Sequence, residues 1–468
     1  MSTSPDFRRA LGPFDATMVV VGGIIGAGIF INPYIVAQRL PSSGWVLAAW
    51  VAGGAIALAG ALAYAELGSL FPKAGGQYVY LRDGYHPLVG FLYGWALLLL
   101  IECGAIAAVA ITFAEYALRL VGRDGASALP LAIGAIVAVS AINYLGVKPG
   151  SRVLNVFVVL KVAALAVLIG AGFLIVPAAP DAGAGLASVG AAGAGDAAAA
   201  ANAGTGALPI LFGAALIPIL FSYGGWQNAN YIAEEIADPR RNLPRSLLAG
   251  TLLVAAVYVL VNVVYLRALG LEGLAATRTP ASDTAGRLLG PAGDRFVAAA
   301  IAISTFGFLD LAVLAPTRVY YAMAADGLFF AGVARLHPRF RTPSLAIVLQ
   351  AAWSIALALT GTYAALVDTV VFADWIFFGL TVASVLVFRR RVPLASRPPG
   401  GFRAPLYPLL PILFAIVAVG VVASVVASNP VRSVVGAVLL LAGVPAYLYW
   451  SRRAPIPAGE ANGRGERE

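Results

Sequence analysis

Residues 21–30 read VGGIIGAGIF, and they lie inside an apolar stretch at residues 14–36. This stretch is long enough to cross a bilayer as a helix, but glycines interrupt it near its middle. A second glycine break, FSYGGW at residues 221–226, interrupts another apolar stretch at about residues 207–231. Paired broken helices are the best sequence pointer to the binding site of a secondary transporter. The pattern therefore predicts a membrane transporter.

The composition agrees with this class. Of the 468 residues, 60% are hydrophobic and 11% are charged, far from the averages of soluble proteins. We predict an all-α integral membrane protein with twelve transmembrane helices in one transporter domain, residues 14–450. The predicted spans are at about residues 14–37, 44–70, 88–118, 129–146, 153–176, 207–232, 247–270, 296–323, 343–361, 365–388, 408–428 and 431–450.

The parts outside the spans are short. Residues 1–13 form a predicted cytoplasmic segment without a cleavable leader, residues 178–206 a passive external linker, and residues 451–468 a disordered cytoplasmic tail. With both termini in the cytoplasm, most of the 31 lysines and arginines lie on the cytoplasmic side. The net charge of +9 then reflects topology and attraction to lipid headgroups, and no nucleic-acid partner is expected.

The two breaks predict complementary contacts. Unwinding at Gly26, Ala27 and Gly28 would leave free amide hydrogens at the start of a second half-helix, where an anionic group such as a carboxylate is favoured. Unwinding at residues 221–225 would free carbonyl oxygens, which suit a substrate ammonium. One carboxylate and one ammonium describe an amino acid. The alternative is that these glycines only permit close packing of helices.

Several separated motifs resemble the amino acid-polyamine-organocation (APC) superfamily, especially its L-type amino acid transporter branch. They are VGGIIGAGIF, the segment FPKAGGQYVYLRDGYHPLVGFLYGW at residues 71–95, FSYGGWQNANYIAEEIADPRRNLPRSL at residues 221–247, and STFGFLDLAVLAPTR at residues 304–318. The resemblance covers predicted helices one to ten. It implies two inverted five-helix repeats, at about residues 14–176 and 207–390, plus helices eleven and twelve at about residues 408–450. It also implies alternating access around a midplane site with helices one and six unwound.

The resemblance also implies roles for individual residues. The amides of Ala27 and Gly28, beside Gly26, would contact the substrate carboxylate. The substrate ammonium would contact carbonyl oxygens at the second break and the carbonyl of Ile24, just before the first break. Phe221 would also act as an aromatic gate. The ammonium set is Ile24, Phe221, Ser222 and Gly224.

Two positions depart from the L-type pattern. Ala27 stands where serine is usual, and Gln227 stands where many relatives have asparagine, which could reshape the side-chain pocket. Both departures leave the identity of the substrate open.

Two charged residues stand inside apolar runs, where charges are costly. Lys161, in VFVVLKVAALAVLIG, resembles the helix-five lysine of sodium-independent relatives, which occupies the place of a sodium ion and ties helix one to helix eight. It could instead carry a proton in a coupled cycle, or reach the interface. Asp310 could pair with Lys161, face a watery cavity, or favour a cationic substrate. Glu66, Glu102 and Glu115 are predicted to be structural or interfacial.

Other polar residues receive smaller roles. Asp374 could line a gate, and the charged residues that follow the second break could close the inward path as a network; these are Glu234, Glu235, Arg240 and Arg241. The chain shows no catalytic motif, metal-ligand cluster or cofactor signature, so no catalytic residue, metal or cofactor is expected. Its single cysteine, Cys103, excludes an internal disulfide, and no disulfide-linked partner is expected.

We therefore predict sodium-independent transport of small or neutral L-amino acids by exchange or facilitated uptake, in a cell membrane, with a bacterial inner membrane as the favoured location. Three alternatives remain open: a proton-coupled symporter that uses Lys161, a transporter of cationic amino acids or polyamines, and an amino acid receptor that does not transport.

Overall fold

The computed structural model describes residues 7–123, 126–175, 208–360, 363–392, 400–428 and 430–453. This part of the chain is helical, apart from one parallel bridge between Leu11 and Ile236. The all-helical prediction is therefore confirmed for the described residues. The predicted external linker at residues 178–206 and residues 454–468 of the predicted tail lie outside them.

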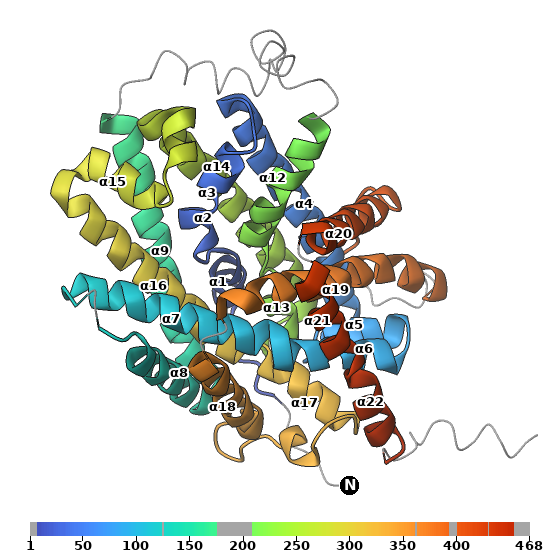
Figure 1. The fold of residues 1–468 in the computed structure, drawn as a ribbon. Helices are drawn as coiled ribbons and strands as arrows, with labels where there is room; N and C mark the ends of the chain where they lie inside the picture. Colours follow the sequence, from blue (N-terminus) through green and yellow to red (C-terminus); the bar gives the residue numbers. More distant parts are fainter. Residues whose placement is uncertain are drawn as a thin grey trace, which may run out of the picture.

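The helices of the first half follow the predicted apolar segments in order (Figure 1). They are α1 (Pro13–Ile24), α2 (Gly28–Ile31), α3 (Pro33–Ala37), α4 (Ser43–Leu70), α5 (Gln77–Gly84), α6 (Pro87–Ala96), the π-helical turn η1 (Leu97–Ile101), α7 (Glu102–Leu120), α8 (Leu129–Tyr144) and α9 (Val147–Ile175).

The second half also follows its predicted segments. Its helices are α12 (Leu208–Tyr223), α13 (Asn228–Tyr231), α14 (Pro239–Ala276), α15 (Pro280–Leu289), α16 (Gly293–Leu314), α17 (Thr317–Ala325), α18 (Ser344–Thr360), α19 (Tyr363–Arg391), α20 (Leu409–Ser428), α21 (Pro430–Leu441) and α22 (Gly443–Ser451). Short 3₁₀ turns lie at Ala233–Glu235, Gly290–Ala292 and Ala331–Ala334.

The boundaries differ from the predicted ones for identifiable reasons. α14 begins at Pro239, eight residues before its predicted span, because the helix continues through a polar first turn that hydropathy does not detect. The predicted helix at residues 296–323 is two helices, since α16 ends at Leu314 just before Pro316. α5 and α15 were not predicted as helices, because neither has the length of a membrane span.

Seven helical stretches of the described chain are long and apolar enough to span a membrane by length and composition. α1 and α12 are among the shorter apolar helices, since both end at the predicted glycine breaks. Unwound residues follow each of them before α2 and α13 begin. The predicted interruption of both helices is therefore confirmed.

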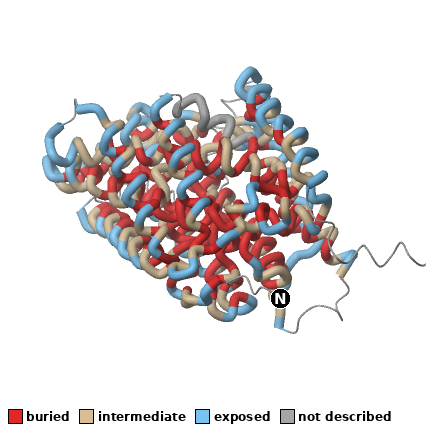
Figure 2. The backbone as a smooth tube through the Cα atoms, turned by 90° about the horizontal axis from the view of Figure 1, so that it is seen from below, coloured by how far each residue is buried: buried red, intermediate tan, exposed pale blue. Residues whose placement is uncertain are grey.

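The interior is formed where α14 packs against α4 and α1, and where α16 packs against α7 and α9. Seen along a perpendicular direction, buried residues fill the middle of the molecule and exposed residues lie around it (Figure 2). Many of these exposed side chains are large and apolar, such as Val156 on α9, Ile416 on α20 and Val434 on α21. An apolar periphery of helices is the surface that lipid requires.

The two breaks touch each other in this interior. A Cβ atom placed on Gly23 would collide with the carbonyl oxygen of Gly225, and one placed on Gly225 would collide with the carbonyl oxygen of Gly23. Gly225 also has a φ of 114°, which disfavours any side chain. The glycines therefore serve both close packing and unwinding at the same point.

This contact predicts that Gly23→Ala lowers stability. The clashing atom is a backbone oxygen that cannot rotate away, so we expect a loss of about 1–3 kcal/mol, measured as a lower melting temperature of the purified protein in detergent. Gly213→Ala on α12 is the matched control, because a Cβ there has no neighbour within 4 Å. Equal melting temperatures for the two variants would contradict the contact.

Candidate functional site

A cavity of about 270 Å³ lies between the two breaks, α7, α16 and α19. Its volume is slightly below the range of about 300–1,000 Å³ found for drug-sized ligands, so it suits a small metabolite. Most of the residues predicted from sequence to form the site line it, namely Ile24, Gly26, Ala27, Gly28, Phe221, Ser222, Gly224 and Gln227. The structure brings these two groups, far apart in the sequence, to one place.

The first break presents amide donors. Ala27 is the residue before α2, and no side chain caps the helix there. Among the described residues, the backbone amides of Ala27 and Gly28 donate none of the hydrogen bonds found in turns and loops. α2 has only four residues, so its dipole is small and the amides themselves are the relevant donors. This geometry suits an anionic group.

The second break presents fewer free carbonyls than predicted. The carbonyl of Phe221 accepts from the amide of Gly224 at 3.3 Å. The carbonyl of Ile24 accepts from the amide of Gly26 at 3.0 Å and from the hydroxyl of Tyr258 at 2.9 Å. The carbonyl of Gly224 accepts no such bond within the described chain. Of these three, Gly224 therefore offers the most accessible acceptor for an ammonium.

Tyr258, on α14, joins the two breaks. Its hydroxyl lies 2.9 Å from the carbonyl oxygen of Ile24 and 3.2 Å from that of Ser222. The side chain is fully buried. Nothing in the sequence pattern marked this residue, because a tyrosine in an apolar helix usually packs in a core.

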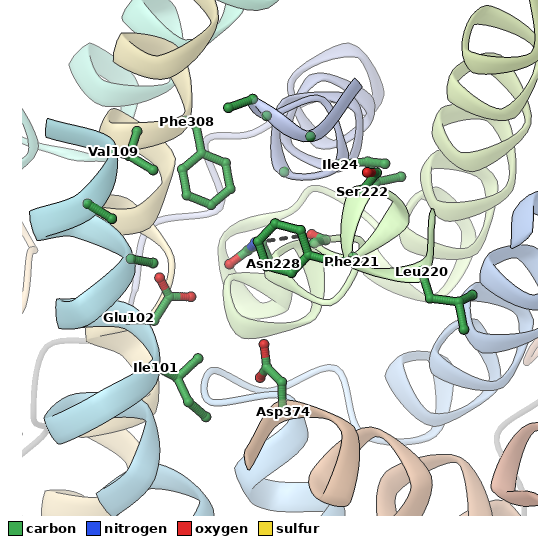
Figure 3. A pocket seen from close by; sticks show the side chains of 18 of the residues that line it. Ile24, Ile101, Glu102, Val109, Leu220, Phe221, Ser222, Asn228, Phe308 and Asp374 are labelled. Carbon is green, nitrogen blue, oxygen red and sulfur yellow. Dashed lines mark hydrogen bonds between the residues drawn. The ribbon is translucent and has the colours of Figure 1, made fainter. Parts of the chain in front are cut away.

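The side chains of Ser222 and Gln227 form hydrogen bonds around the second break. The hydroxyl of Ser222 donates to the carbonyl of Pro218 and accepts from the amide of Asn32, both at 2.8 Å. The side-chain oxygen of Gln227 accepts from the amide of Gly225 at 3.0 Å. Phe221, in contrast, is 46% exposed and projects at the cavity (Figure 3).

Lys161 lies behind the first break, outside the cavity lining. Its buried ammonium donates to the carbonyl of Ile25 at 2.7 Å and lies 3.4 Å from the carbonyl of Gly22. The hydroxyl of Ser304 on α16 also lies 3.4 Å from the carbonyl oxygen of Ile25. Lys161 therefore binds the carbonyl end of α1, where the helix dipole favours a cation.

Asp310 has a different partner from the one considered from sequence. Its carboxylate accepts from the amide of Asn143 at 2.7 Å, and among the described residues it forms no ion pair with Lys161. The suggested pairing is therefore wrong in this structure. Asp310 does not line the cavity either.

Two acidic residues line the cavity although sequence assigned neither to substrate binding. Glu102 follows the π-helical turn η1, and Asp374 comes from α19. Figure 3 shows both carboxyl groups pointing into the space below Phe221 and Asn228. The prediction that Glu102 is structural or interfacial did not include this place in the cavity.

Other contacts join separate segments at the end of the molecule that carries the N-terminus. Arg318 forms a bidentate ion pair with the carboxylate of Glu235, with nitrogen–oxygen distances of 2.9 and 3.0 Å. Both side chains are buried. Beside this pair, the backbone amides of Ala10 and Leu11 donate to the backbone carbonyl of Glu235 at 3.0 Å. The backbone amide of Ala237 donates to the carbonyl of Leu11 at 2.9 Å.

The structure therefore corrects the predicted network of Glu234, Glu235, Arg240 and Arg241, because these residues do not pair with one another in the described chain. Glu235 pairs with Arg318, which sequence placed inside a span, and Glu234 accepts from the amide of Ala74 at 3.0 Å. Arg240 and Arg241 are exposed.

Comparisons with known proteins identify relatives over most of the chain. The model of the family described as amino acid permease matches residues 11–449. The chain is 31% identical over 463 residues to the large neutral amino acids transporter small subunit 2 of Oryctolagus cuniculus, covering 95% of this chain and 82% of that protein. It is 29% identical over 449 residues to the serine/threonine exchanger SteT of Bacillus subtilis (strain 168), covering 95% and 98%. It is also 30% identical over 427 residues to the b(0,+)-type amino acid transporter 1 of Homo sapiens, covering 90% and 84%.

The position of Tyr258 leads to a prediction. Tyr258→Phe removes one hydroxyl that binds both breaks, so we expect a stability loss of about 0.5–1.5 kcal/mol for each hydrogen bond, read from thermal unfolding. Tyr265→Phe, on the same helix, removes one longer bond of 3.4 Å to Ile29 and should cost less. An equal or larger loss for Tyr265→Phe would contradict the role assigned to Tyr258.

Proposed function

The chain belongs to the amino acid permease family, and from this premise we propose sodium-independent secondary transport of amino acids by alternating-access exchange or facilitated uptake. The observation that carries the proposal is the meeting of two broken helices at one cavity, with free amides on one side and a free carbonyl on the other. The chain is a transporter rather than an enzyme.

In the proposed complex the substrate carboxylate binds the amides of Ala27 and Gly28, beside Gly26. The substrate ammonium binds the carbonyl of Gly224. Ile24, Phe221 and Ser222 were assigned to the ammonium from sequence, but their carbonyls already accept hydrogen bonds. They therefore shape this end of the site. Phe221 is the proposed gate, and Gln227 lies at the side-chain pocket.

The proposed architecture has twelve spans. Two inverted repeats at about residues 14–176 and 207–390 contain the broken helices, and helices eleven and twelve follow. The broken helix of each repeat reaches the same cavity, which is what an inverted repeat requires. Rocking of one part against the other would expose the cavity to each side in turn.

Lys161 supports independence from sodium. Its ammonium binds the carbonyl of Ile25 at 2.7 Å, where a coupling cation would otherwise satisfy the unwound backbone. Proton coupling is the second candidate, because the described contacts of Lys161 are uncharged carbonyls and include no carboxylate. Loss of the proton would then leave no unpaired buried anion.

We place the protein in a cell membrane, with a bacterial inner membrane as the favoured location and both termini in the cytoplasm. We propose that it needs no disulfide-linked partner, because its one cysteine, Cys103, is buried and contacts the carbonyl of Gln350 at 3.6 Å.

The proposal predicts counterflow in sodium-free proteoliposomes. Labelled amino acids should enter vesicles preloaded with unlabelled amino acids, and imposing or collapsing a pH gradient should not change the rate. Uptake into empty vesicles driven by external acid would instead establish proton coupling. Binding without any uptake would mean that the chain is a receptor.

A second prediction concerns Lys161. Lys161→Met removes a charged hydrogen bond worth about 1.5–3 kcal/mol, so exchange should fall by about 10- to 100-fold in the same counterflow assay. Arg152→Met is the matched control, because it removes an exposed charge from the same helix. Exchange by Lys161→Met that equals this control would overturn the role of Lys161.

A further inference from the structure

The cavity contains more hydrogen-bond acceptors than the backbone of one amino acid can satisfy. Glu102 and Asp374 line it, and neither forms a hydrogen bond or an ion pair in the described part of the chain. The side-chain oxygen of Asn228, which also lines the cavity, is buried and has no partner. Figure 3 shows these three groups around one region of the cavity.

Of the three groups, Glu102 has the highest cost of burial without a partner. It is only 6% exposed, and it follows the apolar run LLLLI of the π-helical turn η1. A carboxylate in such a place is costly unless a positive charge or a donor binds it. Asp374 lines the same cavity but is itself acidic, so it cannot supply the positive charge that would stabilise the carboxylate of Glu102. The described chain supplies no fixed partner for the Glu102 side chain.

Asn228 points to the same missing partner independently. Its amide nitrogen donates to the carbonyl of Gly225 at 3.0 Å, which fixes the orientation of the side chain. Its oxygen is therefore left as an acceptor without a donor, in a residue that is 4% exposed. A buried acceptor without a donor costs about 1–3 kcal/mol, so a bound donor would stabilise this wall of the cavity.

Among the described residues, the buried lysine and the buried arginine both have other partners. Lys161 binds the carbonyl of Ile25, and Arg318 binds Glu235. Apolar side chains, including Ile101, Val109 and Phe308, line the cavity beside the acidic groups. An alkyl chain that ends in a positive charge matches this combination of apolar walls and a carboxylate end.

We propose that the preferred substrates are amino acids with a cationic side chain, such as lysine and ornithine, whose terminal ammonium binds Glu102, Asp374 and the oxygen of Asn228. This inference rests on the proposed function and identifies its substrate class. It replaces the expectation of small or neutral substrates, and it assigns cation recognition to these residues instead of Asp310, which lies outside the cavity lining.

The test compares lysine with norleucine, which has the same carbon chain but lacks the terminal amine. Binding to the purified full-length protein is measured in sodium-free buffer as displacement of labelled lysine. The wild type should bind lysine at least about tenfold more tightly than norleucine, because a site built for a polar group rejects the analogue that lacks it. Equal affinities, or a preference for norleucine, would overturn the inference without any variant.

Variants then identify the residues responsible. Glu102→Gln and Asp374→Asn should each reduce the lysine-to-norleucine preference in binding by about tenfold, and the thermal unfolding of each purified variant shows separately that it folds. Glu115→Gln is the matched control, because Glu115 is an exposed acid on the same helix and does not line the cavity. An unchanged preference in both cavity variants would overturn the assignment.

The two levels of the proposal fail differently. If no amino acid exchanges in counterflow, the proposed function fails. If neutral amino acids exchange and lysine neither binds nor competes, only the cationic substrate class fails. Lysine binding that requires added sodium would contradict the proposed independence from sodium, and it would overturn the proposed function rather than the substrate class alone.

Discussion

Backbone groups inside a bilayer must be paired, and this requirement governs the centre of the molecule. Interrupting α1 and α12 releases amides and carbonyls far from bulk water. Tyr258 and Lys161 satisfy the carbonyls of Ile24 and Ile25. The groups left over face the cavity, so the interruption that disturbs the helices also leaves backbone donors and an acceptor on the cavity wall. Packing and binding are two consequences of the same unwound turns.

The sequence was sufficient for features that depend on local patterns. Glycines inside long apolar runs predicted both interruptions, and eight of the predicted site residues line the cavity. Lys161 was identified because an ammonium in an apolar run is costly wherever the neighbouring helices lie. The two interruptions and the unusual position of Lys161 needed only the residue types and their spacing, whereas the contacts assigned to Ile24, Phe221, Ser222, Gly224 and Gln227 came from the resemblance to the APC superfamily.

Features that depend on the arrangement of helices could not be predicted. Lys161 and Asp310 looked like partners because they have opposite charges in apolar surroundings, but the structure gives them separate partners in Ile25 and Asn143. Glu102 and Asp374 meet at the cavity from helices far apart in the chain. Periodicity shows which residues share a helix face, but it does not show what that face meets.

The bridge between Leu11 and the segment after α13 has a kinetic consequence. Its backbone hydrogen bonds lie beside the ion pair of Glu235 and Arg318, so separating these segments must disrupt both kinds of contact together. In the alternating-access cycle proposed above, opening at this end would therefore require both kinds of contact to break in the same step. Breaking these contacts together would favour discrete closed and open states, and the rate of opening would rise steeply with temperature.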